Sequence, residues 1–409
     1  MLLLLLLPLL PSQAALGRGA RPAAPLPRPP FAHVAVGGCV GTVAASFVAH
    51  GWDPWMATQA VHLVDDPALT TAFGHLRGQT VRFGGITADW LDYVADPAVS
   101  PPCLWGRQGR APFTPGGSCP FSTGSLDALL HFLENAGVGL LFDLNVLVGR
   151  NCTQPEPRKP DAIAASHGVP NEWCGDHPAP WNTSSVRVLL EHIHGSRNRA
   201  GALTPGRFVG FELGNELFLP KHITPETAAG DIATAADLLK SVWAGGGSSS
   251  ARSSAAGPAG SPLPLPPPPR LYATGTNDCQ HRNNSDTMAV LATLGMRSGF
   301  SFHSYPGNAQ TSWNKSDLTS FLLNASWLRH EILSRTAPCL RAWNSGPRAA
   351  GVLAAVTEAA AMCGFSTIPP GAPTTRSFIH GFFSVAQLGQ YAREGLALVA
   401  RWGIPQVRT

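Results

Sequence analysis

Residues 208–216 read Phe-Val-Gly-Phe-Glu-Leu-Gly-Asn-Glu, a short apolar run that ends abruptly in polar residues. A buried parallel strand has a nearly continuous hydrophobic sequence, and the catalytic groups of an α/β barrel lie where such strands end. Asn215 and Glu216 therefore predict an amide and a carboxylic acid at the mouth of a barrel. This pair suits glycosidic bond cleavage, in which the acid protonates the leaving oxygen while the amide holds a sugar hydroxyl. The alternative is an ordinary polar loop, because short motifs are weak signals in isolation.

The rest of the chain alternates strand-like and helix-like segments, which is typical of a parallel α/β fold. We predict strands at 44–49, 80–83, 138–145, 207–213, 271–274, 299–303, 353–356 and 396–400. Helices are predicted at 125–135, 184–194, 225–243, 316–335 and 374–394. Eight strands favour a (β/α)8 TIM barrel over an open doubly wound sheet, which normally has about five to seven. The 409 residues are enough for one such barrel, assigned to 31–409.

The composition excludes several classes of protein. Apolar residues make up 44% of the chain and charged residues 13%, so the chain can bury a core and is not a disordered charged tail. A net charge of +4 fits an acidic polysaccharide or proteoglycan glycan as partner without requiring one. It is far from the charge pattern of a nucleic-acid-binding protein, so no nucleic acid is expected.

The amino terminus indicates export. Residues 1–16 form a leucine run followed by small residues, as in a secretory signal peptide, although a basic start is missing. Residues 17–30 look like a Pro/Arg-rich spacer, and no transmembrane helix is expected in the mature chain, because no later apolar run reaches about 18 residues. We therefore expect a secreted, extracellular or vacuolar-lysosomal protein. Glycosylation sequons support this: Asn151, Asn182, Asn283, Asn314 and Asn324.

Eight cysteines are scattered through the chain without CxxC spacing. A zinc site is therefore not expected, whereas some disulfides in an oxidising compartment are. Their connectivity does not follow from the sequence.

One segment interrupts the α/β alternation. Residues 245–269 are rich in Gly and Ser, then in Ala, then in Pro. Such a composition cannot bury a core, so we expect a low-complexity surface insertion between a helix and the next strand.

A barrel glycosidase of the retaining type needs a second carboxylate about 5–5.5 Å from the first. The seventh predicted strand supplies a candidate, because residues 352–358 read Val-Leu-Ala-Ala-Val-Thr-Glu and end in Glu358. The alternative is that Thr357 caps a helix and Glu358 stabilises its dipole.

Three motifs occur together in heparanases, in this order and at this spacing: VRFGG at 81–85, LFDLNVLVGR at 141–150 and ELGNE at 212–216. The chain thus resembles the heparanase, or endo-β-glucuronidase, family of glycoside hydrolases, in its plant or algal type. The similarity runs from about residue 40 to 402, interrupted by the insertion. The second and third motifs are the more specific.

The resemblance implies a retaining mechanism with Glu216 as acid/base and Glu358 as nucleophile, and with no metal or organic cofactor. Near Glu358 the chain departs from the family pattern. Thr357 stands where the family has glycine, and no tyrosine follows within residues 359–364.

Further site residues follow from the same resemblance. Arg82, at the end of the second strand, is expected to point into the barrel mouth towards the nucleophile and to keep it ionised. His303 and Tyr305 match a His-x-Tyr motif at the end of the sixth strand, where the tyrosine hydroxyl would bond to the nucleophile. The histidine would orient that network or the sugar.

Two other positions have weaker support. Asn145, which ends the third strand, either lines the sugar cleft or satisfies strand-end backbone. Asp53, in His-Gly-Trp-Asp-Pro-Trp at 50–55, is displaced from the family's substrate-contacting aspartate and is its nearest equivalent.

The family also continues past the eighth strand into a last helix and a β-sandwich, whereas this chain ends at Thr409. We therefore expect the C-terminal sandwich to be largely missing. The expected activity is cleavage of β-glucuronide linkages in acidic polysaccharides or proteoglycans. The alternatives are an exo-β-glucuronidase acting on arabinogalactan-type glycans and a catalytically degraded, glycan-binding barrel.

Overall fold

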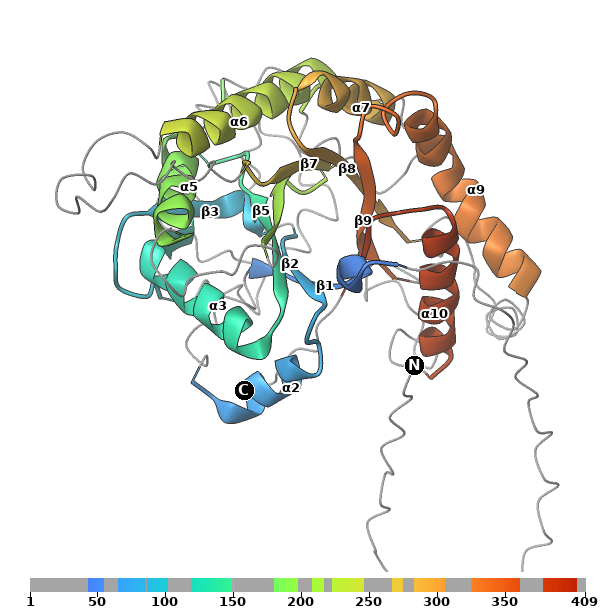
Figure 1. Ribbon diagram of the computed structural model, residues 1–409, viewed down its shortest axis with the longest axis horizontal. Coiled ribbons are helices and arrows are strands. Elements are labelled where there is room, and N and C mark those ends of the chain that lie inside the picture. Colours follow the sequence, from blue (N-terminus) through green and yellow to red (C-terminus); the bar gives the residue numbers. More distant parts are fainter. Residues whose placement is uncertain are drawn as a thin grey trace, which may run out of the picture. The chain divides into compact units, whose positions relative to one another are not determined.

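Eight parallel strands close into a barrel, and they follow one another around it in chain order (Figure 1). This is the (β/α)8 fold predicted from the sequence. The strands are β1 (Val48–Trp52), β2 (Thr80–Phe83), β5 (Gly139–Leu144), β6 (Phe208–Leu213), β7 (Arg270–Thr274), β8 (Ser298–Ser304), β9 (Leu353–Ala359) and β10 (Leu398–Trp402).

The computed structural model describes residues 43–54, 65–85, 87–101, 119–148, 150, 180–197, 208–216, 223–245, 267–274, 283–305, 325–360 and 378–402. All belong to one unit, Val43–Thr409. The predicted signal peptide, the spacer and residues 246–266 of the insertion lie outside the described residues.

Helices surround the strands, as Figure 1 shows. They are α2 (Pro67–Gly74), α3 (Thr123–Ala136), α5 (Ser184–Arg197), α6 (Pro225–Gly245), α7 (Asn283–Thr293), α9 (Ala325–Asn344) and α10 (Phe378–Arg393). Helix α3 illustrates how the sequence sets their bounds. The Ser122 side chain accepts the N–H of Ser125 and caps the start, while Gly137, at φ 76°, ends the helix. Between them Leu126, Leu129 and Leu133 recur at helical spacing and are buried.

Most predicted elements coincide with observed ones, and the differences have local causes. Strand β1 starts at Val48 rather than at residue 44, because residues 45–47 form a 3-10 turn. Helix α9 continues through Pro338 to Asn344, past the predicted end at 335. A two-stranded parallel sheet of β3 (Leu91–Val94) and β4 (Cys119–Ser122) was not predicted, since each strand has only four residues. Helices α2 and α7 were not predicted either.

The inside of the barrel is filled in layers. Inward-facing residues of alternate strands stack in such barrels, and here a buried apolar cluster comprises Ala49, Leu141, Tyr272, Ala355, Leu398 and Ala400. Gly299 leaves room for Tyr272, because a Cβ at this glycine would lie 2.4 Å from the ring. Two residues further along their strands, Asp143 and Glu212 are also buried. The barrel therefore has an apolar floor and a polar layer towards the carboxyl ends of its strands.

Two further observations bear on the expected environment. Cys119 and Cys339 are each disulfide-bonded. In the described part of the chain, no helix combines the length and the apolar character that crossing a membrane requires.

Candidate active site

A β-bulge in β9 turns Glu358 into the barrel. Val356 pairs with Phe302 of β8, but the next pair is Glu358 with His303, so Thr357 is an additional residue. In a regular strand successive side chains alternate between the two faces, and Thr357 would have taken the inward position instead. Bulges commonly re-aim side chains beside active sites. The Thr-Glu pair lies within this strand and does not start a helix, which removes the alternative interpretation of Glu358.

Glu216 follows β6 in an unusual backbone conformation. Its φ is 50°, the only positive value of a non-glycine residue in the described part of the chain, and Gly214 before it has a φ of 67°. The left-handed region is unfavourable for glutamate, and such strain is concentrated at functional sites. The turn presents the carboxylate at the barrel mouth, where 19% of the side chain is exposed.

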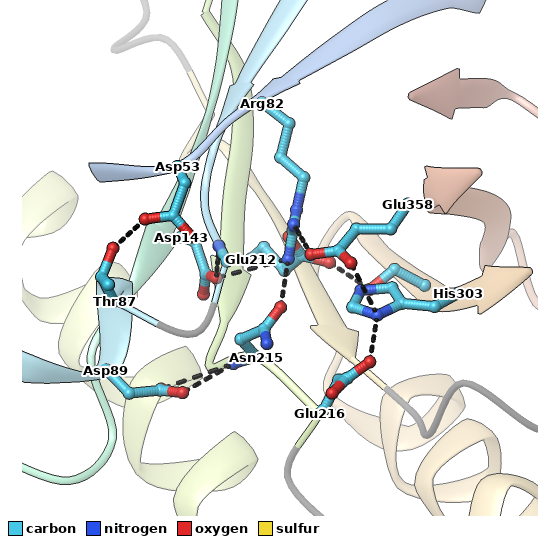
Figure 2. Close-up of polar contacts among 12 residues, drawn as sticks. Asp53, Arg82, Thr87, Asp89, Asp143, Glu212, Asn215, Glu216, His303 and Glu358 are labelled. Carbon is cyan, nitrogen blue, oxygen red and sulfur yellow. Dashed lines mark hydrogen bonds and ion pairs between the residues drawn. The ribbon is translucent and has the colours of Figure 1, made fainter. Parts of the chain in front are cut away.

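The two carboxylates meet across the barrel mouth, with His303 between them (Figure 2). One ligand oxygen of Glu216, one of Glu358 and a ring nitrogen of His303 all lie within 4.8 Å of one another. His303 Nδ1 is 2.8 Å from Glu216 Oε1 and 3.3 Å from Glu358 Oε2. Because both neighbours are acceptors when ionised, we assign the hydrogen to Nδ1. Nε2 of this fully buried ring has no hydrogen-bond partner among the described residues.

Both oxygens of Glu358 are held by other side chains. The Tyr305 hydroxyl donates to Oε2 at 2.5 Å, and Arg82 Nη1 donates to Oε1 at 2.6 Å. The Glu358 side chain is 7% exposed and Arg82 is fully buried. These charge-assisted hydrogen bonds fix the orientation of the carboxylate.

Arg82 is itself held by a second set of groups that the sequence analysis missed. Its Nε donates to Glu212 Oε2 at 2.5 Å, and its Nη2 lies 3.4 Å from Asp143 Oδ2. Burial alone would lower the pKa of Arg82, but Glu212, Glu358 and Asp143 together raise it above its ordinary value. Asp143 and Glu212 are single carboxylates within otherwise apolar buried strands, and this was the available sequence signal.

Asn215 joins the same network through its side chain. Its Oδ1 accepts from Arg82 Nη2 at 3.0 Å, and its backbone N–H faces the Asp89 carboxylate at 3.3 Å. The side chain is therefore anchored to the Arg82 guanidinium within the site.

The two remaining candidates have different contacts. Asn145 is fully buried and donates to the Leu91 carbonyl at 2.7 Å, so it satisfies backbone at a strand end. Asp53 is buried and accepts from Thr87; Figure 2 shows this pair on the opposite side of Arg82 from His303. The structure thus brings together Glu216, Glu358, Asn215, Arg82, His303 and Tyr305.

Within the described residues, Glu216, His303 and Glu358 are also the one group whose ligand atoms could meet at a metal ion. These atoms already contact one another through Nδ1 of His303.

No protein-family model matches the chain, and no curated protein matches it significantly. Solved structures do resemble it in fold. The 4-O-α-L-rhamnosyl-β-D-glucuronidase of Fusarium oxysporum 12S has a TM-score of 0.50 and 13% identity over 88% of this chain. A family GH51 arabinofuranosidase from Xanthomonas axonopodis pv. citri reaches 0.45 and 15% over 83%, and the family 51 α-L-arabinofuranosidase AbfB of Bifidobacterium longum reaches 0.47 and 15% over 92%.

The chain spans only part of these proteins: 63% of the glucuronidase, 60% of the Xanthomonas enzyme and 70% of AbfB. At this identity the likeness concerns the fold alone. The chain therefore has a TIM barrel of the kind found in glycoside hydrolases.

Proposed function

We propose that the protein is a retaining glycoside hydrolase that cleaves β-glucuronide linkages in acidic polysaccharides or proteoglycans. The observation that carries the proposal is the separation of Glu216 and Glu358, which have carboxylate oxygens within 4.8 Å of each other. Retaining enzymes hold their carboxyl groups about 5–5.5 Å apart, whereas inverting enzymes need about 6.5–9.5 Å to admit a water molecule.

In the first step, Glu358 attacks the anomeric carbon and forms a glycosyl ester. The bond from this carbon to the leaving oxygen breaks, and its electron pair stays on that oxygen, which takes a proton from Glu216. We assign this role to Glu216 because it is the more exposed of the two carboxyl groups, whereas both oxygens of Glu358 are held by Arg82 and Tyr305.

In the second step, Glu216 removes a proton from water, the water oxygen bonds to the anomeric carbon, and Glu358 leaves as a carboxylate. Arg82 and Tyr305 donate one hydrogen bond to each oxygen of this carboxylate and so stabilise the leaving group. Neither step needs a metal ion or an organic cofactor.

The glucuronide substrate rests on the three sequence motifs and on compatibility of the fold. A barrel of this fold carries a 4-O-α-L-rhamnosyl-β-D-glucuronidase in Fusarium oxysporum. The amino-terminal leucine run and the five sequons support action in the secretory pathway or outside the cell.

The test is turnover of 4-nitrophenyl β-glucuronide by the wild-type chain, with β-glucoside, β-xyloside and α-L-arabinofuranoside as comparisons. The proposal expects hydrolysis of the glucuronide, with the β-anomer as the first product in NMR spectra. Glu216→Gln and Glu358→Gln should each lower kcat by on the order of 10²–10⁴ without unfolding the chain.

Other outcomes separate the alternatives. An initial α-anomer would contradict the retaining mechanism, and preference for another glycoside would reject the substrate but keep the reaction class. Binding of a glucuronide without hydrolysis would favour a glycan-binding barrel. Release of only monomeric products from a polymer would favour exo over endo action.

A further inference from the structure

Glu212 is a fully buried carboxylate that the reaction described above does not use. It lies in β6, where its neighbours Phe211 and Leu213 pack in the outer apolar core and Glu212 faces the barrel interior. Burying a carboxylate is costly unless it is paired and hydrogen-bonded. A buried acid in this position therefore needs a structural or functional reason.

Both oxygens of Glu212 are occupied. Oε2 accepts from Arg82 Nε at 2.5 Å, and Oε1 accepts from the Ser301 hydroxyl at 2.7 Å. Burial would raise the pKa of Glu212, but the charges of Arg82 and His303 and these hydrogen bonds hold it below its ordinary value. Arg82 and these hydrogen bonds thus favour the ionised form of Glu212 beneath the site.

Arg82 connects this charge to Glu358. The guanidinium is planar, so binding of Nε by Glu212 sets the direction in which Nη1 points. Nη1 then donates to Glu358 Oε1 at 2.6 Å. Nη2 donates to Asn215 Oδ1 at 3.0 Å and to Asp143 Oδ2 at the longer distance of 3.4 Å. Glu212 does not contact Glu358 in this chain of bonds and acts on it through Arg82.

The charge of Glu358 changes during the proposed reaction. In the free enzyme Arg82 is close to three carboxylates, those of Glu212, Glu358 and Asp143. When Glu358 becomes an ester its negative charge is lost, and the nearest remaining counter-charge of Arg82 is Glu212. Without Glu212, of these three acids Asp143 alone, at 3.4 Å, would be left to balance this fully buried guanidinium, which would be disfavoured.

We propose that Glu212 is a positioning residue, which aims Arg82 at Glu358 and remains its counter-ion while Glu358 is esterified. The inference rests on the proposed retaining hydrolase. Loss of the Glu212 charge leaves Arg82 bound more firmly to the Glu358 carboxylate and less stable beside the ester. Ester formation therefore slows, while ester hydrolysis, which restores the carboxylate beside Arg82, slows much less or accelerates.

The test is Glu212→Gln, which keeps the shape of the side chain but removes its charge. The amide oxygen of glutamine can still accept a hydrogen bond from Arg82, and its amide group can still bond to the Ser301 hydroxyl. Rapid release of 2,4-dinitrophenolate from 2,4-dinitrophenyl β-glucuronide reports ester formation, and the later steady state reports ester hydrolysis. We expect ester formation to slow on the order of 10²-fold, and its rate relative to ester hydrolysis to fall at least about tenfold. A purely structural role would slow both steps equally.

Asp231→Asn is the matched control. Asp231 is also buried and paired with an arginine, Arg150, but that pair includes none of the groups assigned to the reaction. This variant should leave the ratio of the two rates unchanged.

A second variant tests the inference if Glu212→Gln does not fold. Ser301→Ala removes one hydrogen bond from Glu212 but keeps its charge. It should shift the ratio in the same direction by about two- to fivefold. Equal slowing of both steps in Glu212→Gln would overturn the inference, as would an unchanged ratio in Ser301→Ala if Glu212→Gln does not fold. Absence of wild-type turnover would instead overturn the proposed function.

Discussion

Glu358 of β9 pairs with His303 of β8, one position beyond a bulge at Thr357. The extra residue moves Glu358 from the helix-facing to the inward side of the strand, where it meets Arg82 and Tyr305 as well. Thr357 is fully buried, and its hydroxyl has no hydrogen-bond partner among the described residues. An unsatisfied buried hydroxyl destabilises a fold by about 1–3 kcal/mol. The bulge that orients Glu358 therefore lowers the stability of the barrel.

Tyr305→Phe should lower kcat about 10–100-fold and lower KM with it, because the hydroxyl bonds to Glu358 Oε2 and helps it to leave from the ester, which accumulates when its hydrolysis slows. Steady-state kinetics on a glucuronide would measure this. Tyr391→Phe is the control, since this buried hydroxyl contacts Ser304 Oγ rather than either carboxylate. It should reduce the free energy of unfolding by about 1 kcal/mol and leave kcat within about threefold. Similar losses of kcat in both variants would contradict the assigned role of Tyr305.

Glu216→Gly should be more stable than Glu216→Ala by about 1 kcal/mol, because only glycine adopts a φ of 50° without cost. Both variants should be inactive. Urea unfolding would measure the difference. At Glu191, an exposed position in helix α5, the order should reverse, with the alanine variant more stable by about 1 kcal/mol. Equal stabilities of the two Glu216 variants would show that the turn is not strained.

Gly84→Ala should reduce both stability and activity. The added Cβ would lie 2.8 Å from the Asp143 Cβ and 3.0 Å from the Arg82 guanidinium, so one of these side chains must move. We expect a loss of about 1–3 kcal/mol in unfolding free energy and at least about a tenfold loss in kcat. Gly230→Ala in helix α6 is the control: nothing lies within 4 Å of its added Cβ. It should raise stability by up to about 1 kcal/mol, and a similar gain for Gly84→Ala would refute the crowding argument.

Asp231 should make stability depend on pH. Burial outweighs the effect of Arg150 and raises the pKa of Asp231 from 3.8 to about 6. The folded chain thus binds this proton more tightly than the unfolded chain. The resulting stabilisation is complete below about pH 4 and is lost as pH rises through 6. The unfolding free energy of wild type minus that of Asp231→Asn should fall by up to about 3 kcal/mol between these values and stay constant above them. If this difference in unfolding free energy instead rises with pH, the ion pair with Arg150 outweighs burial and lowers the pKa of Asp231.

The sequence pointed to those candidate site residues that have reactive side chains and stand at the end of an expected strand. Glu216, His303 and Tyr305 follow or end apolar runs, and a parallel barrel brings such ends to one rim. Whether Glu358 ends a strand or starts a helix was left open by the sequence. Its inward orientation depends on a bulge, which is set by pairing with both neighbouring strands and not by the local residue preferences. Glu212 was missed for a related reason: its partner Arg82 is 130 positions away, and only barrel closure brings them into contact.

Arg82 extends from β2 and is bound by acids on β5, β6 and β9. One cation therefore links four strands of the barrel and also orients Glu358, the proposed nucleophile. Replacing any of these three acids would therefore destabilise the barrel as well as change the candidate site. A relative that lost the proposed hydrolysis would be expected to change Glu216 first, because its carboxylate is the more exposed of the two and contacts His303 at the ends of the strands.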